Sequence, residues 1–145
     1  MFKYNQAMKS PTVNNSLYWQ MLKVMMSAKH RVIALAEPFG LTSMQVFTIG
    51  LLEPGNPQPM NSLSGVLGCD ASNVTGIVDR LEERKLIRRQ DNPEDRRQKM
   101  IVLSADGVKM RQQIIDRLIK DEGSIFATLS PADKKELSRI LAQLV

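Results

Sequence analysis

The segment from Asn61 to Arg84 constrains the fold more strongly than any other part of the chain. Apolar residues recur at helical spacing up to Leu67, Gly68 can end that helix, and Asp70 is a suitable N-cap for a second helix. The positions of the second helix that we expect to face the core are Val74, Ile77, Val78 and Leu81. Two helices joined by a short glycine-containing turn are typical of a helix-turn-helix, although αα-hairpins that do not bind DNA share this pattern.

Two strand-like runs follow the second helix, Leu86–Arg89 and Lys99–Leu103. They are separated by Gln90–Gln98, which contains the turn signal Asp91-Asn92-Pro93. A β-hairpin with a charged tip after a recognition-type helix makes a winged helix. The fold class that we predict is therefore mainly α, with a small β-hairpin wing.

Further helices are predicted on the N-terminal side of this unit. Residues 1–14 are polar and predict an arm, whereas apolar residues follow a helical period from Asn15 to Ala36. A second helix starts at Thr42, where Thr42 and Gln45 form a capping box, and it runs to Leu52. Pro54–Pro59 contains three prolines and predicts a loop, because proline precludes a helix or a central strand.

Two helices are predicted after the hairpin. Ser104 caps a long helix through Thr128, and Ser130-Pro131 followed by Asp133 is a strong start for a last helix. The first and the last two helices are too long and too apolar for one small winged lobe to cover. We therefore expect them to pair between two subunits.

The basic charge of the chain is concentrated around the predicted wing. The net charge is +5, and Arg80–Lys99 holds eight Lys and Arg against five Asp and Glu. A basic segment confined to one region is expected of a protein with a polyanionic partner such as double-stranded DNA. A solvated charged face is the alternative interpretation.

Composition argues against several other classes of protein. No run of 18 apolar residues is present, and the N-terminus lacks the apolar stretch of a secretory signal, so we expect neither a membrane span nor export but a cytoplasmic protein. One Cys and one His exclude an internal disulfide and make a metal site a poor prospect. With no Gly-rich phosphate loop and no Ser-His-Asp arrangement, we expect no enzyme, no catalytic residue and no cofactor.

Three segments carry a resemblance to a known family: Asn73–Glu82, Asn92–Arg97 and Val102–Gly107. Through them the chain resembles the MarR family of bacterial and archaeal regulators, over about residues 15–145, and its Asp-Arg-Arg wing followed by Leu-Ser-x-x-Gly is the most specific part. The resemblance implies a single domain over 1–145, with dimerisation helices at 15–38 and 105–145 and a winged helix-turn-helix lobe at 41–103. It also implies a homodimer, most often a repressor on a pseudo-palindromic operator that a small aromatic or anionic ligand releases.

Two classes of function remain, and they differ in the partner that the basic face binds. The first is a regulator that binds DNA, and the alternative is a winged-helix protein–protein module that binds an acidic partner. Sequence-selective duplex binding with a steep salt dependence separates the two.

Two positions depart from the family pattern. Lys85 stands where the family usually has Gly, so it must adopt a left-handed conformation or the turn must differ, at a cost of about 1 kcal/mol. Gly76 stands where the family often has Arg. Close approach of the backbone to DNA and crowding between helices are both reasons to keep a glycine there.

The predicted DNA contacts lie on the second helix and the wing. They are Ser72, Asn73, Thr75, Gly76, Arg80, Arg96 and Arg97. Short polar side chains in the first helical turns reach base edges or phosphates, and wing arginines enter a narrow minor groove. The alternatives are capping or solvated residues on the helix and pairing of the arginines with Glu94 and Asp95.

The resemblance also implies an ion pair that fixes the wing. The family's matching acid pairs with its matching wing arginine, and in this chain these residues are Asp79 and Arg97. The alternatives are that Asp79 pairs along its own helix with Arg80 or Arg84, and that Arg97 meets Asp95.

A ligand pocket is predicted between the first helix and the DNA-binding lobe. Its candidate residues are Trp19, Met25, Met26, His30, Arg31 and Phe47, with Arg31 meeting the acid of a small aromatic ligand. The alternative is that the Met and aromatic residues are plain core and His30 a structural histidine. Cys69 is interpreted as a small hydrophobe, with a redox-sensing role as the alternative.

Overall fold

The computed structural model describes residues 16–144, without the side chains of residues 122–125. The predicted arm over residues 1–14 lies outside these residues. The chain divides into two compact units, Met1–Ser43 and Met44–Val145. Among the described residues, no single helix has the length and apolar character of a membrane span.

The first unit consists of one long helix and its stop. The helix α2 covers Leu17–Ala36 and the 3-10 turn η1 covers Glu37–Phe39. Gly40 then adopts φ 61°, and its N–H donates to the carbonyl of Glu37 at 2.9 Å. A left-handed conformation is easiest for glycine, so Gly40 is a suitable residue to end this helical segment.

The winged lobe, which we define as residues 44–103, contains the predicted helix-turn-helix. Its helices are α3 (Ser43–Leu51), α4 (Ser62–Leu67) and α5 (Ala71–Glu83). Gly68, with φ 61°, ends α4 as predicted. Val74, Val78 and Leu81 of α5 are buried, whereas Ile77 is only half-buried.

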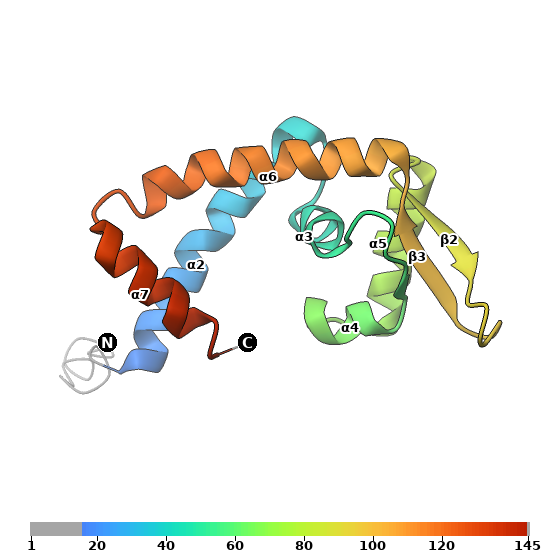
Figure 1. The fold of residues 1–145 in the computed structure, drawn as a ribbon, viewed down its shortest axis with the longest axis horizontal. Coiled ribbons are helices and arrows are strands. Elements are labelled where there is room, and N and C mark those ends of the chain that lie inside the picture. The colour runs from blue at the N-terminus through green and yellow to red at the C-terminus, as the bar shows by residue number, and fades with distance from the viewer. Residues whose placement is uncertain (1–15, 145) are drawn as a thin grey trace, which may run out of the picture. The chain divides into compact units, whose positions relative to one another are not determined.

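A three-stranded antiparallel sheet forms the wing (Figure 1). The strands are β1 (Gln58–Pro59), β2 (Ile87–Asp91) and β3 (Lys99–Leu103), in the order β1-β3-β2. The β2–β3 register runs from Ile87 opposite Leu103 to Asp91 opposite Lys99. The prediction of a loop for Pro54–Pro59 is wrong at its end, because Gln58 pairs with Ile101. Pro59 is tolerated there since β1 is an edge strand.

The helix α6 (Ala105–Ile125) packs tightly onto the end of the winged lobe. Its predicted cap is confirmed: the Ser104 hydroxyl accepts from the N–H of Gly107 at 2.9 Å and donates to the carbonyl of Lys85 at 2.5 Å. A Cβ on Gly107 would lie 1.8 Å from the carbonyl oxygen of Leu86. Only glycine therefore fits this contact.

The helix α7 covers Pro131–Leu141 and begins as its sequence predicts. Ser130 and Asp133 form a capping box, in which the N–H of Asp133 donates to the Ser130 hydroxyl at 3.2 Å. The preceding helix stops at Ile125, three residues before the predicted end at Thr128. No residue of α7 is buried.

Candidate nucleic-acid interface

The N-terminus of α5 is fixed by the carboxylate of Asp70. Its Oδ1 accepts from the backbone N–H of Asn73 at 2.8 Å and from the Ser72 hydroxyl at 2.7 Å. These two hydrogen bonds, the one from Ser72 first, lower the pKa of Asp70 below its usual value. The predicted N-cap is confirmed, and its carboxylate stays ionised where the helix dipole favours a negative charge.

The polar residues predicted to contact DNA lie exposed on α5. The Thr75 hydroxyl donates to the carbonyl of Ala71 at 2.9 Å, so Thr75 and Ser72 offer their hydroxyl oxygens as acceptors. Asn73 is exposed, and its side chain makes no hydrogen bond within the part of the chain that the structure describes. Arg80 is exposed as well.

Gly76 lies on the exposed surface of α5. A Cβ added there would meet no atom within 4 Å. The interpretation that crowding between helices of this chain requires a glycine is therefore wrong. The other reason, close approach of the backbone to DNA, stays a prediction.

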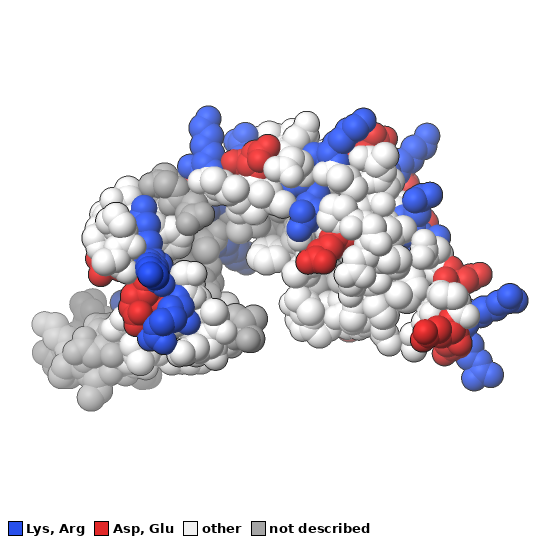
Figure 2. All heavy atoms as spheres, viewed as in Figure 1, with Lys and Arg blue, Asp and Glu red and all other residues white. Residues whose placement is uncertain are grey.

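The tip of the wing is held by hydrogen bonds from backbone N–H groups to side chains. The N–H of Arg97 donates to the Asp95 carboxylate at 3.0 Å. The N–H of Glu94 donates to the side-chain oxygen of Asn92 at 3.0 Å. The guanidinium groups of Arg96 and Arg97 are exposed and form no ion pair within the described residues. Lys and Arg side chains project from the end of the hairpin (Figure 2).

Another arginine, Arg89 of β2, joins the wing to α5 through ion pairs. We call Arg89, Asp79 and Glu82 the Arg89 clamp. The Nη2 group of Arg89 donates to Asp79, its Nη1 group donates to Glu82, and its backbone N–H donates to Glu82 Oε1 at 3.0 Å. Partial burial alone lowers the pKa of Arg89, but the bonds to Asp79 and Glu82 together raise the pKa above its ordinary value.

The predicted ion pair between Asp79 and Arg97 is wrong, because Asp79 pairs with Arg89. Asp79 and Glu82 are one turn apart on one face of α5, so a single guanidinium can reach both. Arg89 shares a strand face with the buried Ile87, whereas Arg97 lies in the turn beyond the last paired residues. One sequence signal could have identified Arg89 as the partner of Asp79: Arg89 lies two residues after the apolar Ile87, so both side chains are on the same face of the strand.

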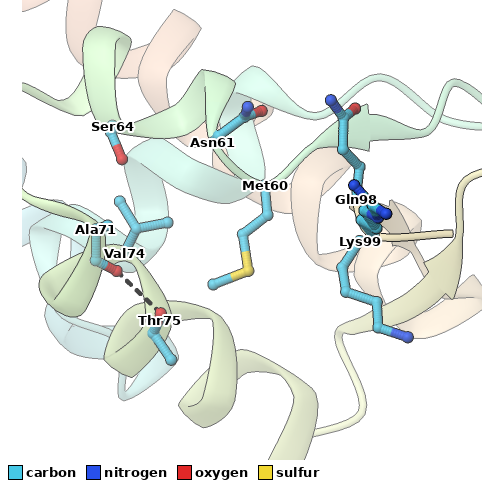
Figure 3. A pocket seen from close by; sticks show the side chains of 9 residues that line it. Met60, Asn61, Ser64, Ala71, Val74, Thr75, Gln98 and Lys99 are labelled. Atoms are coloured by element: carbon cyan, nitrogen blue, oxygen red, sulfur yellow. Dashed lines mark hydrogen bonds between the residues drawn. The ribbon is translucent and has the colours of Figure 1, made fainter. Parts of the chain in front are cut away.

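A cleft of about 300 Å³, the α5–wing cleft, opens between α4, α5 and the hairpin. In Figure 3 the side chain of Met60 extends into it, between Thr75 on one side and Gln98 and Lys99 on the other. Thr75 and Arg97 were predicted as DNA contacts. The other lining residues were not: Met60, Asn61, Ser64, Ala71, Val74, Gln98 and Lys99. Met60 enters the cleft because its N–H donates to the carbonyl of Lys99 at 3.0 Å, which extends the β1–β3 pairing.

The predicted ligand residues are divided between the two units. Trp19, Met25, Met26, His30 and Arg31 lie on α2, and Phe47 lies on α3. All six are exposed, with His30 Nδ1 placed 3.2 Å from the carbonyl oxygen of Met26. The pocket itself stays a prediction.

Two further expectations concern side-chain chemistry. Cys69 is half-buried, and its backbone N–H donates to the carbonyl of Ser64 at 3.2 Å. Within the described residues, no group of three or more His, Cys, Asp or Glu side chains is placed to hold a metal ion.

Comparison with known proteins points to one family. The sequence model of the MarR family matches residues 41–99. The HTH-type transcriptional regulator YwoH of Bacillus subtilis is 31% identical over 104 residues, which are 72% of this chain and 75% of the relative.

Solved structures share the fold at lower identity. The Staphylococcus aureus MepR–DNA complex superimposes with a TM-score of 0.73 at 21% identity, covering 89% of this chain and 96% of MepR. CouR from Rhodococcus jostii RHA1, bound to p-coumaroyl-CoA, superimposes with a TM-score of 0.78 at 23% identity, covering 93% and 95%. Both support the winged-helix fold, with its small antiparallel sheet.

Proposed function

Since the chain belongs to the MarR family and is a DNA-binding transcriptional regulator rather than an enzyme, we propose that it acts as a homodimeric repressor. Its operator is a pseudo-palindromic duplex, and a small aromatic or anionic ligand releases it. The MarR relatives supply the class of function. The contacts of this chain's own residues support the finer statements below.

The Arg89 clamp is the observation that carries the proposal. Helix α5 enters the major groove while the wing reaches the minor groove, so the two must keep a fixed relation. Asp79 and Glu82 on α5 hold Arg89 on β2 by three hydrogen bonds. The clamp also offsets one of the two negative charges of Asp79 and Glu82, which reduces their repulsion of phosphate.

The DNA contacts follow from this arrangement. Asn73 is proposed to read a base edge, because its exposed amide can both donate and accept. Ser72 and Thr75 accept from bases or lie against the backbone, and Gly76 allows the duplex to come close to α5. Arg80 binds phosphate, while Arg96 and Arg97 enter the minor groove.

Exposed apolar side chains support the dimer. On α2 they are Leu17, Tyr18, Trp19, Met21, Val24, Met25, Met26 and Ile33. On α6, on α7 and after it they are Leu118, Ile119, Ile140, Leu141 and Leu144. A monomer rarely exposes so many large apolar groups, and a second copy of the chain would cover them through a two-fold interface.

Ligand control is proposed by analogy with CouR, whose structure holds p-coumaroyl-CoA. The residues proposed for this chain are those predicted from its sequence: Trp19, Met25, Met26, His30, Arg31 and Phe47. Such a ligand acts only if it binds the DNA-competent and the released conformations with different affinity. If aromatic carboxylates at millimolar concentration change neither the melting temperature nor the DNA affinity, ligand control of this kind is wrong.

Selection from a randomised duplex library with the purified protein tests the function. We expect enrichment of one motif with two inverted half-sites about one helical turn apart, or roughly 34 Å. Capture of acidic proteins without enrichment of any duplex would instead favour the protein–protein module.

A further inference from the structure

The α5–wing cleft has a composition that suits one particular ligand. We propose that it binds one deoxyribose–phosphate unit of the DNA strand that passes between α5 and the wing. This inference rests on the proposed function and adds a binding site to it, in which Met60, Asn61, Ser64 and Gln98 join two predicted contacts, Thr75 and Arg97. Met60 forms the floor, and Asn61, Ser64 and Gln98 supply neutral donors.

Charge is the first argument. No acidic residue lines the α5–wing cleft, while Arg97 and Lys99 bring two cations to it. The Lys99 ammonium lies 2.5 Å from Asp91 Oδ1 and is partly neutralised, whereas the guanidinium of Arg97 has no ion pair within the described residues. The cleft is therefore electropositive, and Arg97 is its principal cation.

A second cleft, between the winged lobe and the start of α6, provides a contrast. It has a volume of about 490 Å³ and is lined by Glu82, Lys85, Ile87, Arg88, Ser104, Ala105 and Asp106. There two acids stand against two cations, so the net charge of the lining is zero. Of these two clefts, the α5–wing cleft is the one whose lining favours an anionic strand.

The balance of apolar and polar groups is the second argument. The floor is apolar, from Met60, Ala71 and Val74, and the polar side chains stand around it. The DNA backbone alternates an apolar deoxyribose with an anionic phosphate. The thioether of Met60 can pack against the sugar while the amides of Asn61 and Gln98 donate to the phosphate.

The location of the cleft is the third argument. A duplex with α5 in its major groove and the wing in the adjacent minor groove must pass the intervening backbone between them. The α5–wing cleft lies between these two elements, with Thr75 on one side and Gln98 and Lys99 on the other (Figure 3). Thr75 and Arg97, both predicted DNA contacts, are among its lining residues.

A chemical double-mutant cycle tests the site. In the selected duplex, each phosphate of one half-site is replaced in turn by an uncharged methylphosphonate, and each duplex is titrated with wild type and Asn61→Ala. We expect Asn61→Ala to weaken binding to the unmodified duplex by about tenfold, as for loss of a hydrogen bond to a charged group. At one phosphate, neutralisation should cost the wild type clearly more than it costs the variant.

The control and the salt dependence sharpen the test. Asn56→Ala removes an exposed amide from the loop before β1 and should show no coupling at any phosphate. Because an amide carries no charge and releases no counterion, Asn61→Ala should leave the slope of log K against log salt unchanged. Equal melting temperatures of wild type and both variants establish that the fold is intact.

Two results would overturn the site. If the losses from Asn61→Ala and from neutralisation add at every phosphate, the cleft holds no backbone unit, while selective duplex binding leaves the proposed function standing. If benzoate binds the wild type, and Asn61→Ala and Met60→Ala weaken benzoate but not DNA, the occupant is a small aromatic acid. Absence of selective binding to any duplex would instead remove the proposed function itself.

Discussion

The winged lobe and the outer helices (α2, α6 and α7) differ in how far their apolar side chains are buried. In the winged lobe Ile49, Leu52, Leu81, Ile87 and Ile101 are completely buried. On α2, by contrast, Leu17 is 83% exposed and Tyr18 68% exposed, and Leu144 beyond α7 is 67% exposed. The winged lobe has a core made from its own residues, whereas the outer helices carry large exposed apolar side chains, which we propose that a second copy of the chain covers.

This contrast separates two roles. A lobe with its own core and the Arg89 clamp can hold α5 and the wing in one geometry, as reading DNA requires. Helices with exposed apolar faces are suited to assembly.

The packing of α6 against the winged lobe should be the least tolerant contact. Gly107→Ala places a Cβ 1.8 Å from the Leu86 carbonyl oxygen, so backbone must move, and we expect a loss of about 3 kcal/mol in the free energy of unfolding. Urea unfolding measures it. Gly76→Ala is the matched control, because a Cβ there meets nothing within 4 Å and alanine favours a helix by about 1 kcal/mol. Similar effects of the two substitutions would contradict this description of the contact.

Charge on the exposed face of α2 should break the dimer. Val24 is 66% exposed in the single chain. The substitution Val24→Glu would bury a charge in the dimer interface, and we expect it to cost about 3 kcal/mol, which raises the dimer dissociation constant roughly a hundredfold. Sedimentation equilibrium reports it, with Lys23→Glu as the neighbouring control. A wild type that sediments only at 16.3 kDa at micromolar concentration would rule the dimer out.

Loss of the clamp should weaken DNA binding without removing a phosphate contact. Arg89→Ala frees two carboxylates and releases the wing, so we expect about tenfold weaker binding with an unchanged salt slope. Arg97→Ala or Arg96→Ala should instead reduce the slope by about one where a phosphate contact is lost. Because the side chains of Asp79 and Glu82 are 50% and 38% exposed, solvent screens the clamp, and we expect it to add only about 1 kcal/mol to stability. A reduced slope for Arg89→Ala would identify Arg89 as a DNA contact.

Lys85 carries backbone strain that glycine would relieve. Its φ is 59°, as the departure from the family pattern predicts, and Lys85→Gly should raise the free energy of unfolding by about 1 kcal/mol. Lys109→Gly, within α6, should lower it by about the same amount because glycine disfavours a helix. Thermal melting of both variants measures these changes in stability. If Lys85→Gly lowers the melting temperature, the backbone at Lys85 is not strained.

The features predicted correctly from the sequence depend on neighbouring residues. Asp70 caps α5, Ser130 caps α7 and Gly68 ends α4 through bonds within a few positions of the chain. Local propensity is enough to find such signals.

The features that were missed depend on pairing between distant segments. Strand β1 exists because β3 offers it an edge, and the partner of Asp79 is decided by which side chain the β2–β3 register turns toward α5. A resemblance to relatives suggested Arg97 for that role, but this chain places Arg89 there. The α5–wing cleft was missed for the same reason, since its residues come from three separate segments.

Stoichiometric titration of the selected duplex, followed over a range of salt concentrations, measures whether the protein binds DNA as a sequence-selective dimer. We predict two chains bound per duplex, affinity at least about a thousandfold above that for a scrambled duplex, and a steep linear fall of log K with log salt. Binding that is equal for both duplexes at physiological salt, or that saturates at one chain per duplex, would contradict the account of this protein as a dimeric, sequence-selective regulator.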